Sequence, residues 1–163
     1  MAADRLQRLA ATVLERCRAR GWTLATAESC TGGMIAAALT DIAGSSDVVE
    51  RGFVTYSNAS KSELLGVVPS DIAAHGAVSA EVAAAMAAGV LVHAPVDLAV
   101  AVTGIAGPGG ATRGKPVGLV WFGLARRGAA VRTERHVFPG DRGAVREAAL
   151  ERALALLAEA AQA

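Results

Sequence analysis

The sequence has 163 residues, of which 53% are hydrophobic and 19% charged, and its formal net charge is +1. This length and composition predict one folded domain over residues 1–163 and exclude a disordered chain. The charge is near neutral and forms no basic stripe, so nothing indicates binding to nucleic acid. The two cysteines and three histidines lack the spacing of a disulfide framework or a zinc site, and we therefore expect no metal.

The N-terminal segment is amphipathic. Leu6, Leu9, Val13 and Cys17 recur at helical spacing among arginines, and Gly21 follows as a C-terminal stop. This pattern predicts a helix and argues against a signal peptide. No apolar run reaches the roughly 20 residues that cross a bilayer, so we expect a cytoplasmic protein that does not bind membranes.

Buried strands alternate with helices through the rest of the chain. Strands are predicted at 22–27, 48–57, 97–103, 117–125 and 130–138, and helices at 34–42, from 60, from 79 and after Asp141. Residues 127–128 predict a hairpin between the last two strands. The alternation predicts the α/β class, as a three-layer α/β/α sandwich with a mixed sheet.

Ser29 is a candidate nucleophile because it lies where the first strand gives way to a helix. That position is at the carboxyl edge of the sheet, where α/β proteins bind ligands. The main-chain N–H groups that follow can bind an anion or a developing oxyanion. They belong to Cys30, Thr31, Gly32 and Gly33. In the alternative interpretation, Thr31 only caps the helix and the glycines only form a turn.

A serine nucleophile needs a base, and Lys61 is a candidate. If Ser60 is the N-cap of the next helix, Lys61 is the first helical residue, where the helix dipole and partial burial lower the pKa of the amine. Tyr56, at the end of the preceding strand, is placed to share or orient the proton. In the alternative interpretation, Lys61 is an exposed helix-start lysine and Tyr56 a strand aromatic.

Three other motifs resemble functional sites but lack a residue that each site requires. Residues 109–115 have the spacing of a phosphate-binding P-loop, but Pro116 replaces the required Ser or Thr and a strand follows. Residues 104–110 do not fit G-x-G-x-x-G, so no dinucleotide cofactor is expected. Cys30 and His75 lack a third group to orient them, so we interpret Cys30 as a small packed residue beside the nucleophile.

Three segments together resemble the C-terminal domain of the competence-associated CinA proteins, which also occurs alone as nicotinamide-nucleotide amidohydrolase. They are AESCTGG at 27–33, VTYSNASK at 54–61, and TGIAGPGG at 103–110 with KPVG at 115–118. HGAVS at 75–79 and GDR at 140–142 fit as well, so the resemblance runs from about residue 22 to residue 142. One departure is Arg51 before Gly52, where the family pattern has two glycines.

The resemblance implies an amidohydrolase without metal or cofactor. Its substrate is nicotinamide mononucleotide, and its products are nicotinic acid mononucleotide and ammonia. Ser29 is implied as the nucleophile, Lys61 as its base and Tyr56 as an assisting group. The substrate-binding residues are expected to be Cys30, Thr31, Gly32, Gly33, Thr103, Gly104, Gly107 and Arg142. Two interpretations of Arg142 are equally favoured: a contact to a phosphate, and a surface arginine near a helix cap. Family members commonly associate, so a homo-oligomer is expected.

Two alternatives of a different kind stay open. The first is a non-catalytic module that binds a nucleotide or a protein and is connected with competence. The second is an amidase for another small carboxamide, because acyl-transfer residues do not specify the molecule they act on. Ammonia release from a substrate panel distinguishes the three interpretations.

Overall fold

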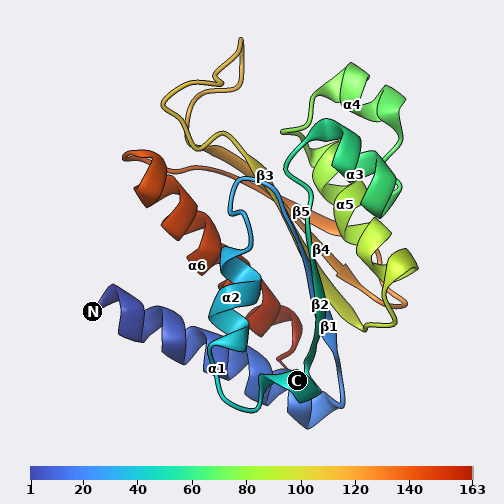
Figure 1. The fold of residues 1–163 in the computed structure, drawn as a ribbon, viewed down its shortest axis with the longest axis vertical. Coiled ribbons are helices and arrows are strands. Elements are labelled where there is room, and N and C mark those ends of the chain that lie inside the picture. Colours follow the sequence, from blue (N-terminus) through green and yellow to red (C-terminus); the bar gives the residue numbers. More distant parts are fainter. Residues whose placement is uncertain (163) are drawn as a thin grey trace.

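The protein is described by a computed structural model over residues 1–162, built around a five-stranded mixed sheet (Figure 1). The strands are β1 (Leu24–Glu28), β2 (Val49–Val54), β3 (Leu98–Gly104), β4 (Leu119–Arg126) and β5 (Arg132–Val137). Their order is β2-β1-β3-β4-β5. β1 is parallel to β2 and β3, whereas β3–β4 and β4–β5 are antiparallel. The predicted α/β class and mixed sheet are confirmed.

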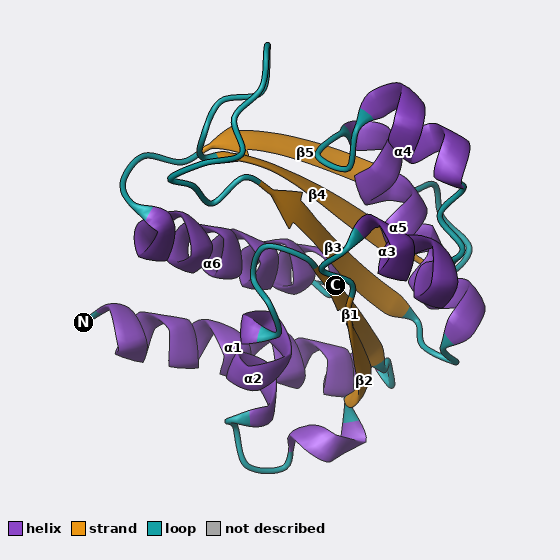
Figure 2. Ribbon diagram, turned by 45° about the horizontal axis from the view of Figure 1, so that its top comes forward, coloured by secondary structure: helices purple, strands orange, loops and turns teal. Residues whose placement is uncertain are grey.

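Helices cover both faces of the sheet (Figure 2). One face carries α1 (Ala2–Arg20), α2 (Met34–Thr40) and α6 (Arg142–Ala160), and the other carries α3 (Asn58–Leu65), α4 (Pro69–His75) and α5 (Ala80–His93). A 3₁₀ turn, η1 (Ser45–Asp47), precedes β2. The sequence did not predict α4, because none of its seven residues is buried and it therefore shows no apolar face. Within residues 1–162, no helix is both long and apolar enough to cross a membrane.

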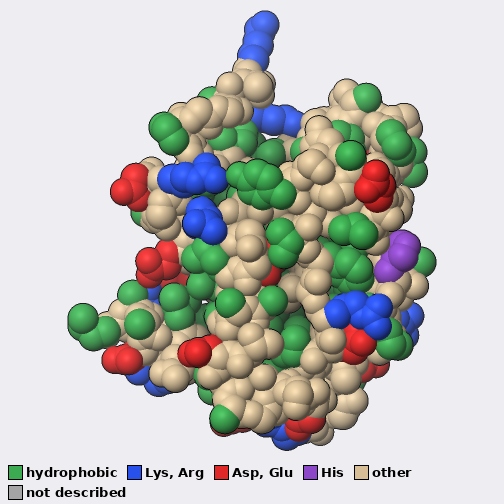
Figure 3. Space-filling view, in the orientation of Figure 1, with side chains coloured by type: hydrophobic (Ala, Val, Ile, Leu, Met, Phe, Trp, Pro, Cys, Tyr) green, Lys and Arg blue, Asp and Glu red, His purple; other side chains and the backbone are tan. Residues whose placement is uncertain are grey.

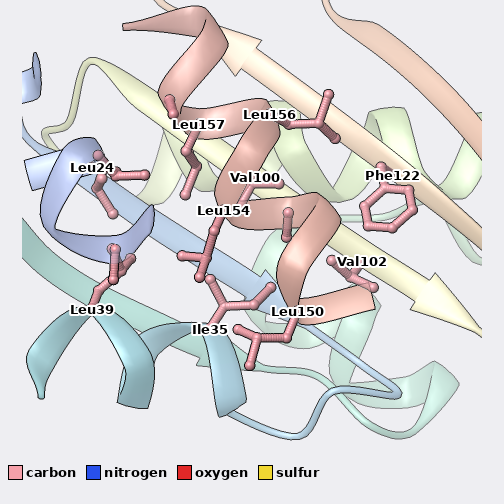
Figure 4. Packing of buried hydrophobic residues seen from close by; sticks show 14 of the residues in the cluster. Leu24, Ile35, Leu39, Val100, Val102, Phe122, Leu150, Leu154, Leu156 and Leu157 are labelled. Carbon is pink, nitrogen blue, oxygen red and sulfur yellow. The ribbon is translucent and has the colours of Figure 1, made fainter. Parts of the chain in front are cut away.

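Large aliphatic side chains fill the layer beneath α1, α2 and α6 (Figure 4). Val100 and Val102 of β3 meet Leu154 and Leu150 of α6 there, and Ile35 of α2 joins them. These leucines and their neighbours along that face of α6 are all buried. This layer fixes α2 and α6 against the strands that end at the site.

The opposite face of the sheet is built from alanine and glycine. Alternate residues of a strand point to opposite faces, and here the positions that meet α5 are small. They are Ala25, Ala27, Ala99, Ala101 and Ala125. At Gly123 the helix is so close that a Cβ would lie 2.2 Å from the carbonyl oxygen of Ala83. The absence of large side chains therefore lets α5 pack directly on the backbone of β4.

The start of α3 differs from the prediction. Ser57, not Ser60, is the N-cap, and its Oγ accepts a hydrogen bond of 3.0 Å from the Ser60 N–H. Lys61 is therefore the fourth residue of α3 and points inward, as Leu65 does one turn later. The prediction that Lys61 is the first helical residue is wrong, because both serines fit a cap pattern and only burial of Lys61 fixes the register.

Two strand ends form the floor of the site. The chain leaves β1 through α2 to reach β2 on one side, and then crosses to β3 on the other side of β1. Parallel sheets open a crevice at the carboxyl ends of strands where connections diverge in this way. The crevice lies at the ends of β1 and β3, where Ser29 and Gly104 line a cavity, and the loop from β3 to β4 projects beyond these strand ends (Figure 1).

Candidate active site

Ser29 is the first residue after β1 and lies at this crevice. Its N–H donates to the carbonyl of Val102 at 3.0 Å, which holds the residue against the end of β3. Its side chain is nearly buried but lines a cavity of about 250 Å³. The predicted placement of Ser29 at the carboxyl edge of the sheet is confirmed.

Lys61 reaches Ser29 from the other side of this cavity. Its Nζ lies 3.1 Å from Ser29 Oγ, 2.9 Å from the carbonyl oxygen of Thr55 and 3.3 Å from that of Tyr56. The residue is only 1% exposed, and burial lowers the pKa of its amine from the ordinary 10.5. The expected lowering of the pKa is confirmed, but burial is its main cause, since Lys61 lies beyond the first turn of α3.

The two carbonyls give the Lys61 amine a direction. A neutral amine has two N–H donors and one lone pair, and the carbonyls of Thr55 and Tyr56 accept those two donors. The remaining direction is the one toward Ser29 Oγ. The lone pair of the neutral Lys61 amine can therefore accept the proton of the Ser29 hydroxyl without movement of the lysine side chain.

Cys30 is a poor nucleophile in this setting. The residue is 6% exposed, and burial raises the pKa of its thiol to about 11, so the thiolate is scarce at neutral pH. A Cβ added at Gly104 would lie 3.0 Å from its Sγ, which shows how closely the end of β3 packs on it. His75 has its Nδ1 3.7 Å from a carboxylate oxygen of Glu81.

Most of the predicted site residues meet at the one cavity. Those that line it are Ser29, Cys30, Tyr56, Lys61, Thr103, Gly104, Gly107 and Arg142. No Asp or Glu is among its lining residues, while the Arg142 guanidinium is, so the cavity favours an anionic ligand. Figure 3 shows basic side chains gathered on this face where α6 begins. The Thr103 hydroxyl donates to the carbonyl of Ala77 at 3.0 Å and so joins the wall to the loop before α5.

Arg142 and Tyr56 interact at the rim. The guanidinium of Arg142 donates to the carbonyl of Gly107 at 2.8 Å and to the Tyr56 hydroxyl at 3.1 Å. The Tyr56 hydroxyl therefore bonds to Arg142, and only the main-chain carbonyl of Tyr56 bonds to Lys61. This differs from the expectation that the phenol itself orients the lysine proton.

The N-terminus of α2 is occupied by the chain's own carboxylate. Glu28 is fully buried, and its carboxylate accepts from Thr31 Oγ1 at 2.6 Å, Ile35 N–H at 2.9 Å and Ala36 N–H at 3.1 Å. Thr31 thus bonds to Glu28 and does not cap the helix. Gly33 stands at the N-cap position.

The turn residues after Cys30 are placed differently from the prediction. Thr31, Gly32 and Gly33 are not among the residues that line the cavity. They shape the turn instead, since Gly32 and Gly33 adopt positive φ angles of 58° and 106°.

Two charged residues that sequence reasoning did not single out hold this turn. The only signal of Glu28 in the sequence is a carboxylate at the end of a buried strand. Such a position is unusual for Glu and could have indicated a specific role. Arg146 of α6 donates to the carbonyls of Cys30 at 3.0 Å and Thr31 at 3.4 Å. Its spacing of four from Arg142 places both on one helix face, but nothing in the sequence says what that face meets.

The chain resembles proteins of known name over nearly its whole length. Residues 6–161 match the family model described as the CinA C-terminal domain. The nicotinamide-nucleotide amidohydrolase PncC of Enterobacter agglomerans is 54% identical over 146 residues, which are 90% of this chain and 89% of that protein. The PncC of Escherichia coli K12 is 51% identical over 158 residues, 96% of this chain and 95% of that protein.

Solved structures share the fold. The competence/damage inducible protein CihA from Agrobacterium tumefaciens superposes with a TM-score of 0.94 at 44% identity, covering 97% of this chain and 96% of that chain. The competence damage-inducible protein A from Klebsiella pneumoniae superposes with a TM-score of 0.91 at 43% identity, covering 94% of this chain and 95% of that chain. This chain belongs to the CinA C-terminal domain family.

Proposed function

We propose that this protein hydrolyses the carboxamide of nicotinamide mononucleotide, giving nicotinic acid mononucleotide and ammonia. One observation carries the amidohydrolase assignment: a buried amine of lowered pKa, Lys61 Nζ, lies 3.1 Å from the hydroxyl of Ser29. The choice of substrate is supported by the relatives named nicotinamide-nucleotide amidohydrolase, which align with this chain over nearly the full length of both.

Acylation begins with neutral Lys61. Ser29 Oγ attacks the carboxamide carbon while its proton passes to Lys61 Nζ, and the carbonyl oxygen becomes an oxyanion. The oxyanion then re-forms the carbonyl and the C–N bond breaks. Lys61 returns the proton to the departing nitrogen, which leaves as ammonia. The nicotinoyl group remains on Ser29 as an ester.

Deacylation repeats these steps with water. Lys61 takes a proton from water as its oxygen attacks the ester carbon, and the bond to Ser29 Oγ then breaks. The proton on Lys61 restores the serine hydroxyl, and the acid product leaves. The nucleophile and the base both come from the chain, so we expect EDTA to leave turnover unchanged.

Arg142 is proposed to bind the phosphate of the substrate. It lines the cavity, and no carboxylate lies within 4.0 Å of it among residues 1–162. Arginine suits phosphate because its planar donors match two phosphate oxygens. Tyr56 contributes at two points, since its hydroxyl holds the Arg142 guanidinium and its carbonyl holds the Lys61 amine.

A substrate panel tests the proposal. We expect ammonia release from nicotinamide mononucleotide, and much slower release from free nicotinamide and from the dinucleotide, because neither offers a terminal phosphate to Arg142. Equal rates on free nicotinamide would contradict the role of the nucleotide. Tight binding of the mononucleotide without ammonia release would favour the non-catalytic alternative.

Three expectations about context stay predictions: a single domain over residues 1–163, a cytoplasmic homo-oligomer, and no affinity for nucleic acid. Light scattering of the purified protein measures the number of subunits and so tests the expected homo-oligomer. Titration with duplex DNA at low salt, where phosphate contacts are strongest, measures the last.

A further inference from the structure

We propose that Arg146 is a positioning residue, which holds the turn after Ser29 so that the main-chain N–H of Cys30 points toward the oxygen of the substrate carboxamide. The inference rests on the proposed function, because it assumes that Ser29 forms a tetrahedral intermediate. It adds a residue outside the cavity lining, which α6 carries on one face of the sheet while α3 carries Lys61 on the other.

The contacts of Arg146 are all to main chain. Its Nε donates to the Cys30 carbonyl at 3.0 Å and its Nη2 to the Thr31 carbonyl at 3.4 Å. Within residues 1–162, no carboxylate oxygen lies within 4.0 Å of its guanidinium. The side chain is half-buried, so one cation serves two consecutive carbonyls immediately after the nucleophile.

Peptide geometry converts these contacts into directions for two N–H groups. The C=O and N–H of one planar peptide point opposite ways, so holding the Cys30 carbonyl turns the Thr31 N–H away from Arg146. The Thr31 carbonyl, which Arg146 also holds, shares a peptide with the Gly32 N–H. That N–H donates to the Ser29 carbonyl at 3.0 Å, which turns the Cys30 N–H out of the turn in the same manner.

Of these two N–H groups, only that of Cys30 belongs to a residue that lines the cavity. Neither donates to a protein oxygen within residues 1–162, although Cys30 is only 6% exposed and Thr31 is fully buried. Unpaired N–H groups are rare in buried residues. The N–H of the residue after a serine nucleophile is a recurrent donor to the oxyanion.

Glu28 removes the competing donors. At the start of α2, its carboxylate accepts from the N–H groups of Ile35 and Ala36, which are then closed to an anion. The donors left beside Ser29 are those of the turn that Arg146 holds. Glu28 and Arg146 therefore fix the turn from opposite ends.

The position of Arg146 is unfavourable for the helix alone. It lies four residues after Arg142 in the first turns of α6, where a cation opposes the helix dipole and the two like charges repel each other. Since no carboxylate offsets these terms, the contacts with the turn are what stabilise Arg146 there.

Arg146→Met tests the proposal, with Arg127→Met as its matched control. Arg127 also donates only to main-chain carbonyls, those of Val96 at 3.0 Å, Leu91 at 2.9 Å and Ala94 at 3.4 Å, but at the opposite edge of the sheet. We expect Arg146→Met to lower kcat about 100-fold with KM for nicotinamide mononucleotide unchanged, as for a misplaced oxyanion donor. Arg127→Met is expected to keep the parent kcat.

Two further readouts separate positioning from stability. Guanidinium ion added to Arg146→Ala is expected to restore part of kcat, and the same ion is expected to leave the kcat of Arg127→Ala unchanged. The rate at which a fluorophosphonate ester labels Ser29 is expected to fall in Arg146→Met, because the phosphoryl oxygen needs the same donor. Labelling does not depend on the mononucleotide, so a slower rate supports this inference even if the parent fails to hydrolyse that substrate.

The proposal is overturned if Arg146→Met keeps the parent kcat and labelling rate, or if it loses activity only in proportion to folded protein. If Arg146→Met does not fold, Arg146→Lys decides, since an ammonium can hold one carbonyl but not both in the fork geometry. A lower kcat at unchanged KM in Arg146→Lys supports the role, and an unchanged kcat overturns it.

Discussion

At the scale of single residues, burial of Lys61 is what converts an ordinary lysine into a base. The residue is 1% exposed and its neighbours are carbonyl oxygens and a hydroxyl, with no carboxylate to favour the ammonium. Burial disfavours the charged form and lowers the pKa. The adjacent thiol shows the opposite consequence of the same burial, since the pKa of Cys30 rises to about 11 and the thiol stays protonated.

Alanine substitutions distinguish Ser29 from its neighbour Cys30 as the catalytic nucleophile. Ser29→Ala is expected to lower kcat by at least about 10⁴-fold, because within residues 1–162 no other side-chain hydroxyl is hydrogen-bonded to the Lys61 amine. Cys30→Ala is expected to lose less than about tenfold, since it removes only a protonated thiol and keeps the main-chain N–H. Ammonia release by both variants, at equal folded protein, provides the measurement. Turnover by Ser29→Ala would remove the serine mechanism.

The pH dependence of kcat/KM follows from the lowered pKa of Lys61. Only the neutral amine accepts a proton, so kcat/KM is expected to rise with pH through the pKa of Lys61, which lies below 10.5. Lys61→Arg is expected to abolish this rise along with turnover, because a guanidinium does not deprotonate. A profile that is flat or falls across this range would exclude Lys61 as the base.

The same shift links folding stability to pH. The folded pKa of Lys61 is below its unfolded value of 10.5, so between the two the unfolded chain binds more protons and stability rises with pH. Below the folded pKa the full cost of burying an ammonium is present. The Tm of the parent relative to Lys61→Met is therefore expected to increase as pH rises toward 10.5. Calorimetry across this range checks the sign, and a constant difference would contradict it.

At the scale of elements, α3 is placed by its contact with α5. A Cβ at Gly89 of α5 would lie 2.1 Å from the carbonyl oxygen of Leu65, which ends α3. The glycine is unfavourable in a helix interior, but it lets α3 approach closely enough for Lys61 to reach Ser29. Packing of helix on helix thus sets a distance in the catalytic pair.

Gly89→Ala is expected to destabilise the fold by about 1–3 kcal/mol, because the added methyl must displace backbone. It is also expected to lower kcat through the shift of α3. Gly143→Ala is the control for stability, since its Cβ would meet only Asp141 Oδ1 at 3.6 Å, an ordinary contact. That variant is expected to be neutral or stabilising by up to about 1 kcal/mol from helix propensity. Chemical denaturation measures both, and equal stability of the two variants would contradict the argument.

Local patterns predicted the elements well where one signal dominated. The seven residues of β3 are almost all buried, as their apolar run indicated, and Asp141 caps α6 as expected. The predicted start of α3 was wrong because Ser57 and Ser60 both satisfy the pattern of an N-cap residue. Only the tertiary burial of Lys61 decides between them.

At the scale of the whole molecule, strand order brings the site together. Ser29 follows β1 and Thr103 is the next-to-last residue of β3, and these parallel neighbours end at the same edge. The alternation of helices and strands was enough to predict that edge. It was not enough to predict the role of Arg146, because that depends on α6 packing over the turn after β1, a contact between segments more than 100 residues apart.

The serine and the lysine are carried by segments that pack on opposite faces of the sheet, α2 with α6 on one and α3 with α5 on the other. Neither face alone assembles a reactive pair, so a partly folded chain has an ordinary alcohol and an ordinary protonated amine. Chemical reactivity therefore emerges only on completion of folding. During refolding, the return of labelling at Ser29 should coincide with the slowest docking of the two layers and not with the return of helical signal.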